Sequence, residues 1–296
     1  MAFPLAVVLW RGATDDFASA ISQPAALAAL RLSLLTSAIS LGVTVTLGTP
    51  LAYGLAHWRF RGRRLVETLV DLPVALPPAV AGLALLMAFG RRGALGPLLG
   101  AFGISLPFTT AAVVMAQIFV AAPFYIRAAR IAFAAIDPHF EEAAIVEGAS
   151  AWQVFTRVMI PIAGRGLLSG MILMWARAMG EFGATILFAG NLEGVSQTMP
   201  LAIYLGFERN SSSALALAVV LIVLSGGPHV CPAQNRRQLA GERCQRVSRC
   251  QAHSSLPTHS VTSHFALAIR NAICMIRANT LHLNRASAMK SLAKLN

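Results

Sequence analysis

Apolar residues gather in long runs along this chain, and charged residues rarely interrupt them. A helix that crosses the hydrocarbon core of a bilayer needs about 20 predominantly apolar residues. Four stretches approach or exceed this length: Leu32–Trp58, Leu72–Gly90, Thr109–Ile126 and Gly166–Gly190. Core helices of a soluble protein would keep a polar face, and these stretches have hardly any. The pattern therefore predicts an all-α fold, a polytopic bundle of transmembrane helices.

Prolines and glycines predict how these spans bend and pack. Pro50 lies inside the first span and Pro77-Pro78 inside the second. Proline lacks the N–H that a helix interior uses, and membranes tolerate it where neighbouring helices or a cavity satisfy the freed carbonyls. We therefore expect kinks at both places. Small residues allow close helix packing in membranes, which is expected at Gly166, Gly170, Gly180 and Gly183.

Composition agrees with a membrane location. Of the 296 residues, 56% are hydrophobic and 12% are charged, whereas soluble domains carry roughly 25% charged residues. The net charge of +12 would fit a nucleic-acid ligand, but residues 226–296 hold ten of the Lys and Arg residues and a single acidic one. All four cysteines also lie in that segment. We therefore expect no nucleic-acid partner, and neither a disulfide nor a thiolate metal site in the preceding residues.

Basic loops predict the direction of the spans. The segment 59–64, directly after the first span, holds four arginines, and cytoplasmic loops carry an excess of Lys and Arg. Alternation then places residues 91–107 outside and 127–165 inside. Arg91 and Arg92 oppose this orientation but are outnumbered by the arginines of the two inside loops.

The inside loop predicts a first short helix between residues 137 and 148. Asp137 suits the N-cap and Pro138 the first helical position, where its missing N–H costs nothing. Gly148 can take the left-handed conformation that ends a helix. Three glutamates make this helix acidic, namely Glu141, Glu142 and Glu147. A helix that lies on lipid headgroups would be rich in Lys and Arg, so docking of a soluble partner is the favoured interpretation.

A second short helix is predicted to follow the glycine. Ser150 and Gln153 have the spacing of a capping box, and Pro161 is expected to end the helix. One apolar stripe is expected at helical spacing, formed by Trp152, Phe155 and Met159.

The loop resembles the EAA motif of ABC-importer permeases. The matching residues are Glu142-Ala143-Ala144, Gly148 and Val158-x-Ile160-Pro161. The resemblance covers residues 24–225 and implies a type I importer permease. It further implies that the loop is a coupling helix seated in a cleft of a cytoplasmic ATPase subunit, with Ser150, Trp152 and Phe155 belonging to it. The resemblance also implies that the chain pairs with a second copy of itself, works with a periplasmic binding protein and lies in the inner membrane of a bacterium.

The segment after the loop resembles the oxyanion branch of that family. Residues 175–191 and the run Gln197-Thr-Met-Pro-Leu-Ala-Ile-Tyr204 are most similar to molybdate permeases. Sulfate and thiosulfate permeases share the Gly-Glu-Phe-Gly core, so sulfate or thiosulfate is the alternative substrate. The resemblance thus implies import of a tetrahedral oxyanion, molybdate first.

Two charged residues lie within the fourth predicted span. Arg177 and Glu181 are four residues apart, hence on one helix face, and charges inside a bilayer usually face a partner or a water-filled path. One interpretation is that they line the translocation path with Phe182 and Gly183, Arg177 attracting the anion. The other is that they neutralise each other and fix helix packing. Both remain open at this point.

No catalytic constellation is present, and no G-x-x-x-x-G-K-[ST] phosphate loop. We therefore expect a transport subunit rather than an enzyme, without cofactor or metal, whose ATP is hydrolysed by a separate subunit. A secondary transporter or channel is the alternative from another class. It predicts inverted repeats between the two halves, which the sequence does not show.

Three regions are expected along the chain. Residues 1–24 are the remnant or end of an extra span, and 25–225 form the permease domain with its loop 137–161. Ala214–Ser225 starts a last span that Gly226-Gly227-Pro228 ends, after about 18 Å of helix against roughly 30 Å of hydrocarbon. Residues 226–296 form an atypical basic tail. A reading-frame shift, which would leave a truncated and non-functional permease, and a genuine accessory domain both explain that tail.

Overall fold

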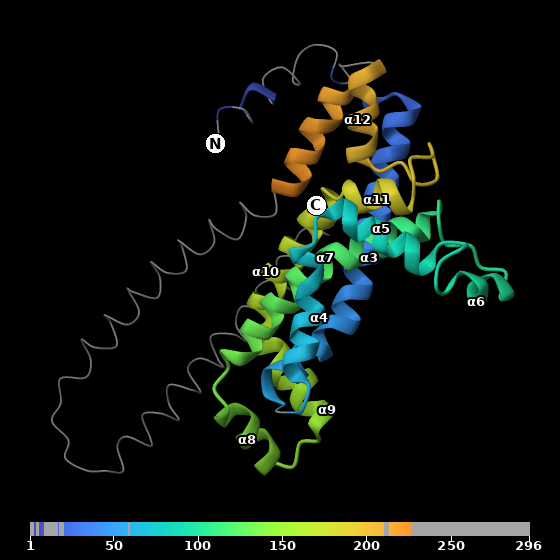
Figure 1. Ribbon diagram of the computed structural model, residues 1–296. Coiled ribbons are helices and arrows are strands. Elements are labelled where there is room, and N and C mark those ends of the chain that lie inside the picture. The colour runs from blue at the N-terminus through green and yellow to red at the C-terminus, as the bar shows by residue number, and fades with distance from the viewer. Residues whose placement is uncertain are drawn as a thin grey trace, which may run out of the picture. The chain divides into compact units, whose positions relative to one another are not determined.

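Figure 1 shows the computed structural model, which describes residues 21–58, 60–209 and 213–226 together with 3, 6–8 and 17. The chain divides into the units Met1–Gln234 and Asn235–Asn296, and all described residues belong to the first. Within them every regular element is a helix, which confirms the all-α prediction. The expectations for the tail, and nearly all of those for residues 1–24, fall outside the described residues.

The helices follow one another with short connections (Figure 1). In chain order they are α3 (Pro24–His57), α4 (Arg63–Ala75), α5 (Pro78–Phe89), α6 (Gly96–Ala101), α7 (Thr110–Ala134), α8 (His139–Val146), α9 (Ala151–Gln153), the π-helix η1 (Val154–Met159), α10 (Ile160–Met179), α11 (Gly183–Phe188), α12 (Met199–Arg209) and a last apolar helix Ser213–Gly226.

Three helical segments are long and apolar enough to cross a membrane: Pro24–His57, Thr110–Ala134 and Ala151–Met179. The first contains the predicted span Leu32–Trp58 apart from Trp58 itself. The second contains the predicted span Thr109–Ile126 apart from Thr109. A fourth span is added if the pair α4 and α5 is counted as one. The described part of the chain is therefore that of a multi-pass membrane protein.

Helices α3, α7 and α10 pack together around one apolar core. Tyr125, Phe133 and Met174 are fully buried in it. Helices α7 and α10 can cross closely because glycines of α10, which have no side chain, lie at the contact. A Cβ on Gly166 would come within 2.4 Å of the Ala132 Cβ, and one on Gly170 within 2.9 Å of the Ala128 Cβ. The predicted packing role of these two glycines is confirmed.

The second predicted span, Leu72–Gly90, is not one helix. The chain bends by 117° between α4 and α5. Leu76 and Pro77 are extended, with ψ of 138° and 136°, because a residue that precedes proline is disfavoured in the helical region. The bend at Pro77-Pro78 was predicted, whereas the continuous span was wrong. Pro50 lies within α3, which stays helical through it.

The fourth predicted span, Gly166–Gly190, is also broken. Helix α10 ends at Met179, and residues 180–182 are not helical before α11 begins at Gly183. The helix instead extends towards the N-terminus, running without interruption from Ala151 to Met179. The prediction that Pro161 ends a helix is therefore wrong.

Candidate functional site

The loop between α7 and α10 begins with helix α8, and Asp137 lies just before it. The backbone N–H of His139 donates to the Asp137 Oδ1 at 3.0 Å. Asp137 thus accepts the first N–H of α8, but the helix starts at His139 with Pro138 at the N-cap position, so the predicted start was one residue early. Glu141 and Glu142 lie in the first turn, where the partial positive charge of the helix end favours carboxylates.

The end of α8 is a Schellman motif built on Gly148. This glycine has φ of 84°, the left-handed conformation that L side chains avoid. The N–H of Gly148 donates to the Ile145 carbonyl at 2.9 Å, and that of Ala149 to the Ala144 carbonyl at 3.0 Å. Ala144 also packs, half-buried, against the main core, while Ala143 is exposed. The predicted glycine turn is confirmed.

The capping box that starts α9 is formed as predicted. The N–H of Gln153 donates to the Ser150 Oγ at 3.4 Å, and the N–H of Ser150 donates to the Gln153 Oε1 at 2.9 Å. Ser150 therefore orients the start of the 29-residue helix that ends at Met179.

A π-helical turn, η1, explains why Pro161 is tolerated in this helix. At its end the N–H of Ile160 donates to the Phe155 carbonyl, five residues back. The wider turn changes the hydrogen-bonding register just before the proline, which has no N–H to contribute. Phe155 and Met159 are buried in the core, whereas Trp152 is 70% exposed. The rings of Trp152 and Phe155 nevertheless contact, with centroids 5.6 Å apart, so the predicted stripe leads from the exposed surface into the core.

Glu141 anchors the loop to the end of α3. The hydroxyl of Tyr53 donates to the Glu141 Oε1 at 2.9 Å, and the Nε2 of His57 lies 3.7 Å from the Oε2. The ring of Tyr53 also contacts that of Phe155, with centroids 5.0 Å apart. From the sequence, Glu141 was predicted only to make α8 acidic. A detectable signal was present, since Tyr53 and His57 are four residues apart and polar at the end of an apolar span.

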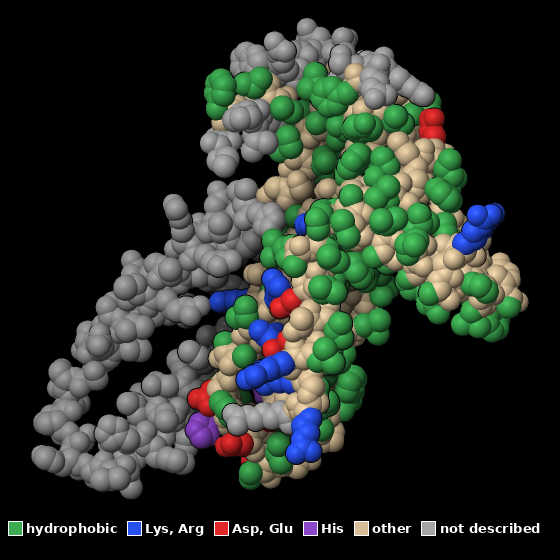
Figure 2. Space-filling view, viewed as in Figure 1, with side chains coloured by type: hydrophobic (Ala, Val, Ile, Leu, Met, Phe, Trp, Pro, Cys, Tyr) green, Lys and Arg blue, Asp and Glu red, His purple; other side chains and the backbone are tan. Residues whose placement is uncertain are grey.

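The outer face of the loop combines exposed apolar and acidic side chains. Val146 is 86% exposed, and Glu142 and Glu147 are exposed beside it. Figure 2 shows acidic side chains and a histidine gathered at this end of the unit, over α8. We call the exposed apolar residues the docking face; they are Phe140, Ile145, Val146 and Trp152. Exposed apolar side chains with acidic residues beside them are typical of a protein-binding surface.

The second group of predicted site residues lies at the break between α10 and α11. Arg177 Nη1 and Glu181 Oε2 are 2.6 Å apart, with side chains 28% and 1% exposed. Glu181 Oε1 also accepts the N–H of Ala184 at 2.8 Å. Arg177 is on α10 and Glu181 beyond its end, so the expectation that both share one helix face is wrong. The pairing itself, which one of the two interpretations required, is present.

The break packs against the start of α5. A Cβ on Gly183 would lie 2.9 Å from the Pro78 Cβ, and one on Gly82 would lie 2.8 Å from the Ala184 Cα. Phe182 contacts the ring of Tyr204, with centroids 5.3 Å apart. The two interrupted spans therefore meet at their interruptions. Helix α10 separates this site from the docking face by 20 residues, roughly 30 Å.

Comparison with known proteins agrees with this arrangement. Residues 45–227 match the profile of the family described as binding-protein-dependent transport system inner membrane component. The molybdenum transport system permease protein ModB of Mycobacterium tuberculosis is 42% identical over 225 residues, 76% of this chain and 85% of that protein. The sulfate transport system permease protein CysW of Synechococcus elongatus is 36% identical over 194 residues, 66% of this chain and 68% of that one.

Solved structures agree on the fold. One match is a chain of a bacterial alginate ABC transporter, solved in complex with an alginate pentasaccharide-bound periplasmic protein. Its TM-score is 0.62 and its sequence identity 18%, and the match covers 76% of this chain and 86% of that chain. The family match runs from within α3 to the last described helix and includes both groups of candidate residues. The chain therefore belongs to the inner membrane components of binding-protein-dependent transport systems, the ABC permeases that its loop motif resembled.

Proposed function

We propose that this chain is the membrane-spanning permease subunit of an ATP-driven molybdate importer in a bacterial inner membrane. The observation that favours molybdate is that a molybdenum permease matches at 42% identity over 85% of its length, whereas a sulfate permease matches at 36% identity over 68% of its length. Sulfate is therefore the second candidate.

The docking face is proposed to bind a cytoplasmic ATPase subunit. Its four apolar residues are exposed in this chain, and no phosphate-loop motif in the sequence could hold ATP. The face is held in a fixed orientation from both sides. Glu141 joins it to α3, and the capping box of Ser150 joins it to the helix that includes α10. A second copy of the chain and a periplasmic anion-binding protein complete the proposed assembly.

The uninterrupted helix Ala151–Met179 is proposed to carry movement from the ATPase to the translocation path. Its 29 residues extend roughly 40 Å, and the bound ATPase would act on its first turn. At the far end the chain leaves the helical conformation at residues 180–182. Non-helical backbone at membrane depth is tolerated where it is buried in protein or lines a cavity.

Arg177, Glu181, Phe182 and Gly183 are proposed to line that path near the break. The side chain of Arg177 stays 28% exposed while that of Glu181 is buried. An entering oxyanion would therefore meet the cation and not the carboxylate. The Arg177–Glu181 pair also supports the helix break, so the two interpretations of this pair are compatible.

Uptake of radiolabelled molybdate into membrane vesicles tests the proposed function. The vesicles contain this chain with the ATPase and anion-binding subunits from the same genome. We expect ATP-dependent uptake that excess unlabelled molybdate abolishes and an equal excess of sulfate leaves largely intact. Equal competition by sulfate would assign the chain to sulfate instead. Uptake that persists without the ATPase would indicate a secondary transporter.

A further inference from the structure

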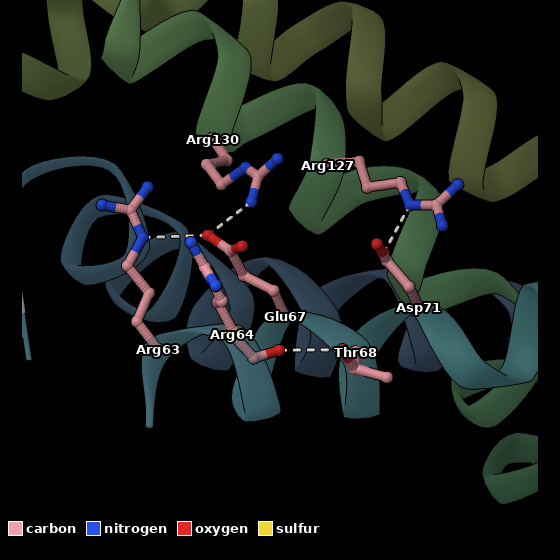
Figure 3. A network of polar contacts seen from close by, with 7 residues as sticks. All are labelled: Arg63, Arg64, Glu67, Thr68, Asp71, Arg127 and Arg130. Atoms are coloured by element: carbon pink, nitrogen blue, oxygen red, sulfur yellow. Dashed lines mark hydrogen bonds and ion pairs between the residues drawn. The ribbon is translucent and has the colours of Figure 1, made fainter. Parts of the chain in front are cut away.

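Helix α4 turns its charged face towards the protein. Glu67 accepts hydrogen bonds from Arg63 at 2.9 Å and pairs with Arg130 at 2.7 Å, and Asp71 accepts one from Arg127 (Figure 3). Arg127 and Arg130 belong to α7. The network therefore attaches α4 to α7 and pairs both carboxylates of α4 with arginines, as charges at membrane depth require.

The opposite face of α4 is an exposed row of leucines. Leu65, Leu69 and Leu72 are 64%, 57% and 47% exposed, and their spacing of four and three residues places them on one side of the helix. Just before α4, Trp58 and Phe60 are exposed as well. In a membrane protein such a row can face hydrocarbon, and exposed aromatic rings suit the interface between lipid and water.

Two arginines at the start of α4 are left without a carboxylate. Arg61 and Arg64 are exposed, and within the described part of the chain neither forms an ion pair, whereas Arg63 is engaged by Glu67. Gly62, with φ of 98°, makes the turn between them. An open recess is lined by Phe60, Arg61, Gly62, Arg63 and Arg64. Unpaired cations thus line a recess with Phe60 and directly precede the leucine row along the chain.

We infer that residues 60–72 form a docking site for an acidic phospholipid, with Arg61 and Arg64 on the headgroup phosphate and the leucine row against the acyl chains. Charge complementarity accounts for the arginines, since a basic residue near an anionic membrane surface favours binding. The adjoining leucine row favours a lipid over free phosphate as the ligand, because free phosphate would contact the arginines and leave the leucines without a partner. The inference rests on the proposed placement of this loop at a membrane surface, and its test does not require transport.

Lipid binding by the purified full chain tests this site. The chain is held in an uncharged detergent, and retention of added phosphatidylglycerol or phosphatidylcholine is measured by native mass spectrometry. The variant Arg61→Gln/Arg64→Gln is compared with Arg91→Gln/Arg92→Gln, which removes the same charge from two other exposed arginines. We expect the wild type and the 91/92 variant to prefer phosphatidylglycerol. The 61/64 variant should bind it roughly 30-fold more weakly, at about 1 kcal/mol per arginine.

Each other result overturns the proposal. Equal binding of the two lipids by the wild type would remove the site. The site would also be ruled out if both double variants kept the preference for phosphatidylglycerol, or if both lost it. Displacement of phosphatidylglycerol by millimolar inorganic phosphate would assign the arginines to a soluble anion. A 61/64 variant that keeps its lipid preference but no longer binds the ATPase subunit would assign them to that protein.

Discussion

At the residue scale the loop depends on one backbone conformation. Gly148 is left-handed, and a Cβ there would meet no atom within 4 Å. Any effect of a side chain at this position is therefore one of backbone strain rather than of collision. A substitution at Gly148 therefore tests the backbone conformation of the loop without disturbing its side-chain packing.

We predict that Gly148→Val weakens ATPase binding. The left-handed conformation costs an ordinary residue about 1–2 kcal/mol, and a β-branched side chain tolerates it least, so the Schellman turn should open and the docking face lose its orientation. Copurification of the ATPase subunit measures the loss. Gly148→Asn is the matched control, because asparagine visits this conformation readily, and it should retain the ATPase. Equal retention by both variants would contradict the role given to the turn.

Glu181 is the buried carboxylate on which the helix break depends. Removing one partner of a fully buried pair costs about 3–5 kcal/mol, and the partial exposure of Arg177 reduces our expectation for Glu181→Gln to roughly 2 kcal/mol. The apparent melting temperature in detergent should fall by roughly 5 °C. Arg177→Met/Glu181→Gln should recover at least half of that loss, since no unpaired charge remains.

The same two variants separate packing from transport. If Arg177 attracts the anion, the double variant regains stability but not molybdate uptake. Full uptake by the double variant would leave the pair with a structural role only. A melting temperature unchanged in both variants would contradict even that role.

At the element scale the sequence predicted helix ends better than helix continuity. The capping box of Ser150 and Gln153 and the turn at Gly148 were identifiable because their chemistry is local. The break after Met179 was not, because the residues on both sides of it are similarly apolar. It depends on the buried Glu181, which caps α11 through Ala184, and on contact with α5. These are tertiary interactions with no sequence period.

The π-helix η1 was likewise beyond prediction from the sequence. Pro161 is ordinarily a stop signal, and only the change of register at residues 154–159 lets the helix continue. The anchoring of Glu141 by Tyr53 joins residues 88 positions apart, which no local pattern shows.

We predict that Gly82→Ala separates α5 from α11. The new Cβ would lie 2.7 Å from the Ala184 carbonyl oxygen and 2.8 Å from its Cα, both backbone atoms, so one helix must move. Overpacking of this kind costs about 1–3 kcal/mol, measurable as a lower melting temperature. Gly42→Ala is the control, because its Cβ meets nothing within 4 Å and alanine favours a helix. It should be neutral or stabilising. Equal effects of the two would contradict the close crossing.

At the scale of the whole molecule, the docking face and the helix break lie at opposite ends of α10. A signal between them must pass through this helix and the core that α3, α7 and α10 share. The helix has no interruption between Ala151 and Met179, so a shift at the loop can reach the break as a rigid-body movement. The central claim is therefore that the outer face of α8 contacts the ATPase.

Photo-crosslinking from α8 tests that contact most directly. Val146→Cys, the most exposed apolar position of the loop at 86%, is labelled with a benzophenone maleimide after the native cysteines, Cys231, Cys244, Cys250 and Cys274, are replaced by serine. Phe102→Cys, 74% exposed beyond α6, is the matched control. Irradiation of the assembled transporter should join the ATPase subunit to position 146 and not to position 102. No adduct at 146, or equal adducts at both positions, would contradict the claim.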